Sequence, residues 1–240
     1  MDLKELELGI DPSTHWYFQS KKVPLIRFVK EVSRKHNRKV MLVDVGSGSG
    51  FFMHELVKTV PELIEKVWLV DTGYTDEEVK ESVDLQLEKT RTLPDRIENA
   101  VVVMMDVLEH LENDDAMLSD VRSRCRGVNH FFITVPAFID LWSGHDVYLG
   151  HHRRYTSGTL RELLERGRFQ RYRIFYLYLA IFPLVWLMRK LRSKQEVAST
   201  TSKAVNPLVN AILRGYNSLE MSISRANGLF GVTCAAEGEI

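Results

Sequence analysis

The sequence predicts an α/β fold built on a mostly parallel sheet. Apolar runs at residues 39–45, 66–71, 100–106 and 130–136 have the length of buried strands, and a helical stretch separates the last two. Strands that alternate with helices in this way form parallel sheets. A length of 240 residues suits one large domain, and we expect residues 1–240 to form it.

The first half of the chain offers two helices and one further strand. Residues 24–36 carry apolar side chains at helical spacing after a proline, which suits a first helical turn. A second helix is expected from Phe51 to Thr59, because Pro61 stops it. Residues 83–88 alternate between apolar and polar side chains, which predicts a half-buried strand.

The second half predicts a helix over about 157–167, a strand over about 169–176 and a last strand over 231–237. The polar, Ser/Thr-rich segment 193–205 is the best candidate for a mobile loop.

A further helix is expected before the last strand. Asn206 and Pro207 are good N-cap and first-turn residues, and Gly228 can end the helix. An apolar stripe at helical spacing lies between them, formed by Leu208, Ile212, Tyr216, Leu219 and Ile223.

The composition excludes several classes of protein. Apolar residues make up 45% and charged residues 27%, as in an ordinary soluble globular protein. The 32 basic residues equal the 32 acidic ones, whereas a dedicated nucleic-acid binder shows a basic excess, so we expect no nucleic-acid partner. Cys125 and Cys234 form no CxxC pair, and the acidic N-terminus lacks a secretory signal. These features predict a cytoplasmic protein.

Two charge runs break the overall balance. Residues 106–120 carry six acids and no lysine or arginine, and residues 166–194 carry eight basic residues and no acid. A single charge run is usually a solvated face, but the basic run here encloses an apolar segment.

The most specific motif is a glycine-rich loop between a strand and a helix, Asp44-Val-Gly-Ser-Gly-Ser-Gly-Phe51. Glycines let the chain turn tightly and let a ligand approach the backbone, and the following helix presents unpaired N–H groups. Asp71 follows Gly50 by 21 residues, at the end of the next strand, where an acid can accept hydrogen bonds from both ribose hydroxyls. We therefore expect a nucleoside cofactor at Asp44, Gly46, Ser47, Gly48, Gly50 and Asp71.

Two cofactor classes use this geometry, although small-residue turns also close plain α/β units. The dinucleotide pattern GxGxxG needs a glycine where Phe51 stands, which disfavours an NAD(P)-dependent oxidoreductase. The pattern here is GxGxG with an acid two residues before it. That pattern resembles motif I of the class I S-adenosylmethionine-dependent methyltransferases.

The segment Asp106-Val-Leu-Glu-His-Leu111 resembles the "LEHL" segment after the fourth strand of many of these methyltransferases. An acid at the carboxyl end of a strand faces the ligand crevice, so Asp106 is expected near the cofactor. Glu109 and His110 can instead simply start a helix. For His110 a supporting structural role competes with a chemical one.

The resemblance extends to a bacterial methyltransferase family often associated with saccharide assembly. It is carried by HWYF at residues 15–18, by VPAFIDLWSGHDVYLGHHRRYT at 135–156 and by the closing helix and strand. It implies a Rossmann-like class I fold with a seven-stranded, mostly parallel sheet. It also adds Trp16 to the expected cofactor contacts.

The resemblance implies four parts of the single domain: an N-terminal helical lid (1–36), a cofactor-binding core (37–176), a helical insertion (177–228) and the last strand (229–240). Lys21 and Lys22 depart from the family, which tends to arginine there. A short segment between the second and third strands leaves the adenine contact unassigned.

The acceptor side is expected after the strand that ends near Val135, in a loop dense in polar side chains. Methyl transfer is an in-line displacement that must remove a proton from a hydroxyl acceptor. His145 is our first choice for the base and His151 the second, with Asp146 beside them. Contacts with the acceptor are expected from Trp142, Arg153, Arg154 and Tyr155, the arginines as clamps on a phosphate or carboxylate.

Other interpretations of this loop stay open. His145, His151 and His152 could bind a metal with Asp146, but sequence spacing cannot show convergent ligands, and we expect no metal. Thr156 could cap the next helix, and Tyr155 could pack rather than bind.

Residues 174–188 contain no charge. As a helix they would span about 22 Å, short of a hydrocarbon core of about 30 Å, and Pro183 interrupts them. Either this segment packs in the core or in a dimer interface, or it dips into an anionic membrane surface with Trp186 near the headgroups. A lipid-linked acceptor would explain the second case.

The sequence thus predicts a methyltransferase that moves a methyl group from S-adenosylmethionine to an oxygen, with nitrogen as the second choice. The acceptor is a small or saccharide-type molecule, lipid-linked if the protein contacts the inner face of the membrane. The alternatives are an NAD(P)-dependent oxidoreductase and a non-catalytic module that binds S-adenosylmethionine.

Overall fold

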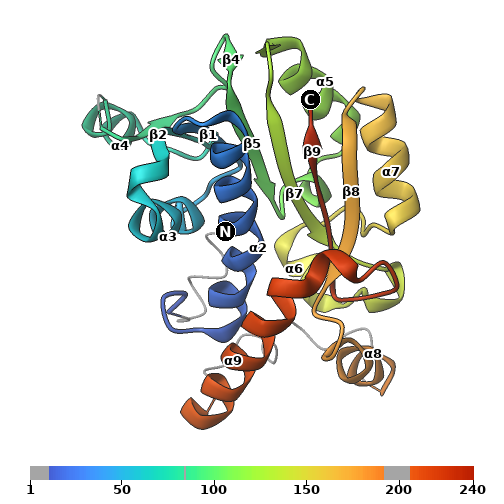
Figure 1. Cartoon of the computed structure of the whole chain (residues 1–240). Coiled ribbons are helices and arrows are strands. Elements are labelled where there is room, and N and C mark those ends of the chain that lie inside the picture. The colour runs from blue at the N-terminus through green and yellow to red at the C-terminus, as the bar shows by residue number, and fades with distance from the viewer. Residues whose placement is uncertain (1–10, 84, 192–205) are drawn as a thin grey trace.

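The computed structural model describes residues 11–83, 85–191 and 206–240 (Figure 1). It confirms the α/β class and the seven-stranded sheet, whose order is β3-β2-β1-β5-β7-β9-β8. The strands are β1 (Val40–Val45), β2 (Ile64–Val70), β3 (Leu87–Thr90), β5 (Ala100–Met105), β7 (His130–Pro136), β8 (Gln170–Leu177) and β9 (Thr233–Glu239). Two short strands, β4 (Ile97–Glu98) and β6 (Cys125–Arg126), pair separately.

The sheet is parallel except at one strand. β3, β2, β1, β5 and β7 pair in parallel, whereas β9 runs antiparallel to both β7 and β8. After β1 the chain builds outward on one side through β2 and β3, and then returns to add β5 on the other side. In open sheets the ligand crevice lies at such a switch point, outside the carboxyl ends of the strands. This topology places the candidate site beside the ends of β1 and β5.

Helices cover both faces of the sheet (Figure 1). Helices α2 and α3 pack on one face and α5 and α7 on the other, while α9 lies against α2 and α8 follows the end of β8. The helices are α2 (Trp16–His36), α3 (Phe51–Thr59), α4 (Asp76–Glu81), α5 (Asp114–Arg124), α6 (Gly144–Leu149), α7 (Ser157–Arg166), α8 (Phe182–Leu191) and α9 (Pro207–Ile223).

The core divides into two layers because successive strand residues point to opposite faces. Val103 faces the α2 side with Leu25 and Leu56, and its neighbour Val102 faces the α5 side with Leu118. These side chains are fully or almost fully buried. The strands of this sheet are therefore apolar on both faces, as the continuous apolar runs predict.

The prediction for the first helix was wrong at its start. Helix α2 begins at Trp16, eight residues before the expected start, and Pro24 lies inside it. A proline removes one helical hydrogen bond. The turns before Pro24 are held by tertiary packing, because Trp16 and Tyr17 both contact the ring of Tyr178.

The same helix was expected to act as a lid over residues 1–36. Its C-terminal half is part of the core, where Leu25 and Val29 are completely buried. Residues 1–10 lie outside the described part of the chain. A lid role therefore concerns only the first turns of α2 and stays a prediction.

Other boundaries differ less. The strand expected at residues 83–88 is β3, Leu87–Thr90, because a capping box between Thr75 and Glu78 starts helix α4 just before it. The last strand begins two residues later than expected, at Thr233.

The start of α9 is confirmed, with Asn206 as N-cap and Pro207 in the first turn, but the helix ends at Ile223, before Gly228. Its buried side chains are Asn217 and Met221, so the apolar stripe faces outward. The loop expected at 193–205 lies outside the described residues.

One buried histidine gives the fold a pH dependence. His130 on β7 is 4% exposed and lies 2.9 Å from the ring of His36, nitrogen to nitrogen. Burial lowers the pKa of His130 to about 4. An unfolded chain takes up this proton near pH 6.5, so acidification from there to about pH 4 favours unfolding, by at most about 1.4 kcal/mol per pH unit for this group.

We expect His130→Phe to flatten the acid side of the stability profile, measured as the free energy of urea unfolding between neutral pH and about pH 4.5. His152→Phe, at an exposed histidine, is the control and should keep the wild-type slope. Equal slopes in the His130→Phe variant and the wild type would contradict this account.

Candidate active site

The glycine loop after β1 has the left-handed backbone that its sequence requires. Gly46, Gly48 and Gly50 have φ angles of 66°, 53° and 70°. A Cβ on Gly46 would also lie 2.7 Å from Cγ2 of Val107. Glycine is therefore needed at Gly46 both for backbone conformation and for the close approach of the segment after β5.

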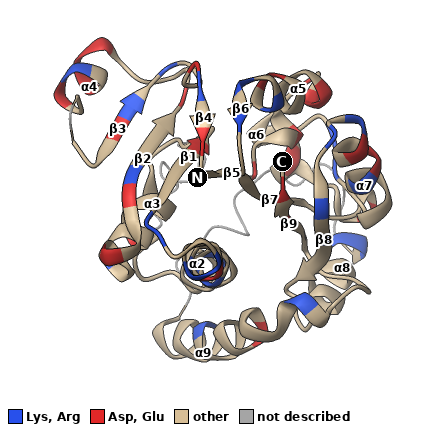
Figure 2. Ribbon diagram, turned by 45° about the horizontal axis from the view of Figure 1, so that its top comes forward, with Lys and Arg blue, Asp and Glu red and all other residues tan. Residues whose placement is uncertain are grey.

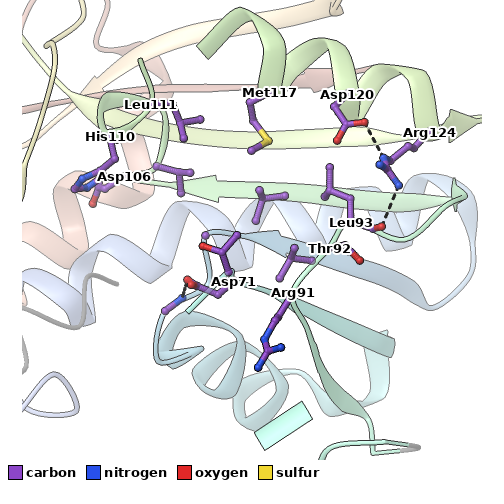
Figure 3. Close-up of a pocket in the computed structure, with 16 residues that line it drawn as sticks. Asp71, Arg91, Thr92, Leu93, Asp106, His110, Leu111, Met117, Asp120 and Arg124 are labelled. Atoms are coloured by element: carbon purple, nitrogen blue, oxygen red, sulfur yellow. Dashed lines mark hydrogen bonds and ion pairs between the residues drawn. The ribbon is translucent and has the colours of Figure 1, made fainter. Parts of the chain in front are cut away.

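Asp71 follows β2 and faces this loop (Figure 3). Its Oδ2 accepts a hydrogen bond from the Gly48 amide at 2.8 Å, and its Oδ1 accepts one from the Gly73 amide at 2.9 Å. The carboxylate is thus held at the rim of the crevice with lone pairs left for a ligand. This is the geometry that the sequence predicts for a ribose-binding acid.

A cavity of about 520 Å³ opens at the switch point. Small-molecule and cofactor sites usually fall between about 300 and 1,000 Å³. Strand ends supply one wall of the cavity and α5 supplies another, as Figure 3 shows. The lining residues are Val45, Gly46, Gly48, Val70, Asp71, Thr72, Arg91, Thr92, Leu93, Asp106, Val107, His110, Leu111, Met117, Asp120 and Arg124.

Two expected cofactor residues lie behind the loop and support it. Asp44 is buried, and burial raises its pKa to about 7. Ser47 contacts the Tyr74 hydroxyl at 2.7 Å, and that hydroxyl also donates to the Gly48 carbonyl at 2.8 Å. Both residues shape the loop from behind rather than from the cavity.

Trp16 is placed differently from the expectation. Its backbone amide donates to Asn210 of α9 at 2.9 Å, and its ring packs edge-on against Tyr178. Trp16 does not line the cavity. Its contact with a cofactor stays a prediction.

Lys21, which the sequence marks only as a departure from the family, lies directly behind the site. It is completely buried, and its ammonium donates to the Tyr17 hydroxyl at 2.9 Å and to Asp106 Oδ2. Although burial lowers the pKa of Lys21, the Asp106 carboxylate outweighs it and leaves the pKa raised. The signal was the position of Lys21 between Phe18 and Leu25, on the buried face of α2.

Three ligating side chains converge just beyond Asp106. Atoms of Glu109, His110 and His151 all lie within 4.8 Å of one another, and the two imidazoles pack edge-on with ring centres 4.6 Å apart. Glu109 is completely buried and neither of its carboxylate oxygens has a hydrogen-bond partner. Burial, and then the charge of Asp106, raise the pKa of Glu109 well above its usual value.

His151 is oriented by Asp146, the residue that the sequence places beside it among the catalytic candidates. The His151 Nδ1 lies 3.0 Å from Asp146 Oδ1, and Arg154 donates to the same carboxylate at 2.7 and 3.1 Å. Burial alone would raise the pKa of Asp146, but the bonds from His151 and Arg154 hold it below its usual range. With Nδ1 bonded to Asp146, Nε2 is the ring nitrogen available to the cluster.

The structure gives the two arginines carboxylate partners inside the protein. Arg154 donates to Asp146 and to the Ala137 carbonyl. Arg153 donates to Asp114 at 2.8 Å and to the Glu112 carbonyl at 2.6 Å. Part of the acidic run at residues 106–120 thus forms ion pairs inside the protein. A clamp on an acceptor anion stays a prediction for both arginines.

The remaining acceptor-side residues are spread over several elements. The Tyr155 hydroxyl is buried and donates to Asp114 at 2.7 Å, and burial raises its pKa. Thr156 caps α7, which confirms the alternative interpretation of the RRYT segment. His145 lies in the first turn of α6, which begins at Gly144, and Trp142 comes just before that helix. His145 is outside the cluster that contains His151.

These features fit an adenosyl cofactor. The cavity offers loop amides and the N-terminus of α3 at one end, the carboxylate of Asp71 as an acceptor for hydroxyl groups, and the apolar side chains of Leu93 and Met117 against which a base can stack. The Glu109–His110–His151 cluster lies next to this cavity, since His110 belongs to both. A donor cofactor and an acceptor can therefore meet at His110.

We expect Asp71→Ala to weaken the binding of S-adenosylhomocysteine by about 1.5–3 kcal/mol, because charge-assisted hydrogen bonds are lost. Isothermal calorimetry measures this, with Glu77→Ala on the exposed side of α4 as the control. NAD should not bind. Unchanged affinity in Asp71→Ala, or tight binding of NAD, would contradict the assignment.

Comparison with known proteins agrees with this geometry. Residues 15–170 match the methyltransferase-domain family. The plantazolicin methyltransferase BpumL in complex with S-adenosylhomocysteine has a similar fold, with a TM-score of 0.55, 14% identity and coverage of 91% of this chain and 83% of that one. A methyltransferase of Haloferax volcanii, solved with its Trm112 activator, gives a TM-score of 0.51 at 14% identity over 90% and 92% of the two chains. No curated protein matches the sequence.

At such low identities the solved structures support only the fold, and the assignment to a family rests on the family match. It covers more than half of the chain and includes the glycine loop, Asp71, Asp106 and the histidine cluster. The chain therefore belongs to the methyltransferase-domain family and is a class I methyltransferase whose methyl donor is S-adenosylmethionine.

Proposed function

We propose that this enzyme methylates an oxygen, with nitrogen as the second choice, on a small or saccharide-type acceptor. The observation that carries the proposal is the contact between the cofactor cavity and a histidine held by a carboxylate. His110 lines the cavity, and His151, fixed by Asp146, lies against His110. An acceptor hydroxyl placed at this cluster lies beside a group that can accept its proton, next to the methyl donor.

His151 has better support for this role than His145, the first choice from sequence. General bases need to be held in place as well as titrate near neutral pH, and Asp146 holds His151 through Nδ1. His151 also belongs to the cluster that adjoins the cavity. His145 neither lines the cavity nor belongs to this cluster.

The charges around the cluster favour an acceptor without a large negative charge. Lys21 and Arg154 are matched by Asp106 and Asp146. These two cations are therefore not left to hold a phosphate, whereas a neutral polyol such as a sugar needs no counter-charge. This supports a saccharide-type acceptor, as the sequence resemblance implies.

The test is transfer of a radiolabelled methyl group from S-adenosylmethionine to a panel of hydroxylated acceptors, including nucleotide sugars and a lipid extract. With the best acceptor, we expect His151→Ala to lower turnover by roughly 10²–10⁴-fold and to leave S-adenosylhomocysteine affinity unchanged. His152→Ala, at the exposed neighbour, should retain activity.

Full activity in His151→Ala together with a large loss in His145→Ala would return the base to His145. Labelling of no acceptor by a protein that binds S-adenosylhomocysteine would favour the non-catalytic binding module.

We also propose that helices α8 and α9 rest on an anionic membrane. Both project from the same end of the molecule and carry few charged residues (Figure 2). None of the described helices is long and apolar enough to cross a membrane. The exposed apolar side chains of α8 and α9 are Leu184, Leu187, Met188, Leu191, Leu208, Val209, Ile212, Tyr216, Leu219 and Ile223. Apolar side chains exposed in this number on two helices at one end of the molecule (Figure 1) are typical of an interaction surface.

The apolar segment 174–188 is divided by the structure. Its first part is strand β8, whose residues Phe175 to Leu177 are buried, and its exposed residues lie in α8 and in the turn before it. The expectation that Arg171 and Arg173 flank the exposed face was wrong. They lie at the start of β8, where they pair with Glu239 and Glu237. Arg189 and Lys190 remain as the basic residues of α8.

The position of the patch links it to the acceptor. Strand β8 runs parallel to β7, since both are antiparallel to β9, so α8 leaves the sheet at the edge that carries the active site. A membrane contact there would bring a lipid-linked acceptor toward the cluster. This supports a position at the inner face of the membrane.

We expect the wild type to float with vesicles rich in phosphatidylglycerol, more weakly at high salt and on neutral vesicles. The double variant Leu187→Asp and Ile212→Asp should lose this binding and keep its affinity for S-adenosylhomocysteine. Val128→Asp, at an exposed valine beyond the other end of the sheet, is the control. Suppose instead that the wild type is a dimer that does not bind anionic vesicles, and that the double variant is a monomer. The exposed apolar side chains of α8 and α9 then form a dimer interface.

A further inference from the structure

The geometry points to a divalent transition-metal site formed by Glu109, His110 and His151, although the sequence predicted no metal. Its role rests on the proposed function, since the ion would engage the acceptor oxygen, but its existence can be tested without an acceptor. The site differs from the set considered from sequence, because Glu109 and His110 replace His145 and His152.

The spacing of the donor atoms supports one shared ion. One ligand atom from each residue lies within 4.8 Å of the other two. Bonds of about 2.0–2.2 Å to one ion place ligand atoms roughly 3–4 Å apart, so small side-chain rotations close the remaining difference. Two imidazoles and one carboxylate are a donor set that zinc and other first-row transition metals accept, with positions left open for other oxygens.

Glu109 supplies the second, independent observation. Its side chain is completely buried, and both of its oxygens are without a hydrogen-bond partner. Leaving a buried carboxylate unpaired is costly. The nearby cations are already engaged, Lys21 by Asp106 and Arg154 by Asp146. One negative charge is therefore uncompensated when Glu109 is ionised, and a bound cation balances it.

The surroundings of His151 are those of a metal-binding histidine. Ligating histidines commonly give their other ring nitrogen to a carboxylate, which fixes the tautomer and turns the ring toward the ion. Here Asp146 holds Nδ1 of His151, and Arg154 holds Asp146 in turn. Nε2 is thereby presented to Glu109 and His110.

A cation at this place would suit transfer to oxygen. In the metal-bound form His151 is a ligand and no longer the base, because Asp146 and the ion occupy both of its ring nitrogens. The ion takes over the task by lowering the pKa of the coordinated hydroxyl, so that the acceptor loses its proton to solvent near neutral pH. The alkoxide oxygen then forms a bond to the methyl carbon while the carbon–sulfur bond of the sulfonium breaks. The electron pair stays on sulfur, which gives S-adenosylhomocysteine. An acceptor with two adjacent oxygens could fill two open positions.

The experiment uses the full-length protein, treated with a chelator, dialysed and titrated with Zn²⁺ in a calorimeter, with S-adenosylhomocysteine titrated separately. We expect one Zn²⁺ per chain. Glu109→Gln and His110→Ala should each weaken Zn²⁺ binding by more than tenfold, and Asp146→Asn should weaken it by roughly 10–100-fold. His152→Ala is the matched control and should bind Zn²⁺ like the wild type.

The outcomes separate the two proposals. A wild type that binds S-adenosylhomocysteine but not Zn²⁺ overturns the metal site and leaves the proposed function standing. Zn²⁺ binding that persists unchanged in both Glu109→Gln and His110→Ala places the ion elsewhere and also overturns it. Failure to bind S-adenosylhomocysteine counts against the proposed function, whatever Zn²⁺ does. Retained S-adenosylhomocysteine binding shows that the Glu109→Gln and Asp146→Asn variants are folded. For His110→Ala, whose side chain lines the cofactor cavity, an unchanged circular dichroism spectrum and melting temperature show this instead.

Discussion

The ion pair between the completely buried Lys21 and the partly exposed Asp106 is the interaction on which the rest of the site depends. It joins helix α2 to the carboxyl end of β5 through two residues that are 85 positions apart in the chain. Asp106 has the left-handed φ of 57°, which costs a non-glycine residue about 1–2 kcal/mol. Removing the Asp106 carboxylate would cost about 3–5 kcal/mol, because the buried Lys21 would be left without its counter-charge. The pair thus fixes both α2 and the segment that follows β5.

That segment borders both the cavity and the histidine cluster. Asp106 and Val107 line the cavity, and two residues further on Glu109 enters the cluster. Asp146 and Arg154 position His151 from the opposite side. Lys21 and Arg154 are each paired with a carboxylate, whereas Glu109 has no hydrogen-bond partner. In the proposed function the donor and the acceptor meet at His110, which belongs to both the cavity and the cluster.

Much of the fold could be predicted from the sequence because its strands are long apolar runs with clear ends. Helix α3 and strands β1, β5 and β7 lie within a residue of their expected places. Asp71 and the glycine loop could be assigned because strand, turn and helix follow each other locally. Lys21 and Glu109 could not, since their roles come from contacts made only after α2 and the loop before Tyr155 have packed. The start of α2 was missed because tertiary packing outweighs the effect of Pro24.

The central claim is that the crevice at the ends of β1, β2 and β5 holds the methyl donor beside the Glu109–His110–His151 cluster. A crystal structure of the complex with S-adenosylhomocysteine tests it most directly. The account expects both ribose hydroxyls on Asp71, the adenine between Leu93 and Met117, and the sulfur directed toward His110. A nucleoside bound elsewhere, or with its sulfur turned away from this cluster, would contradict it.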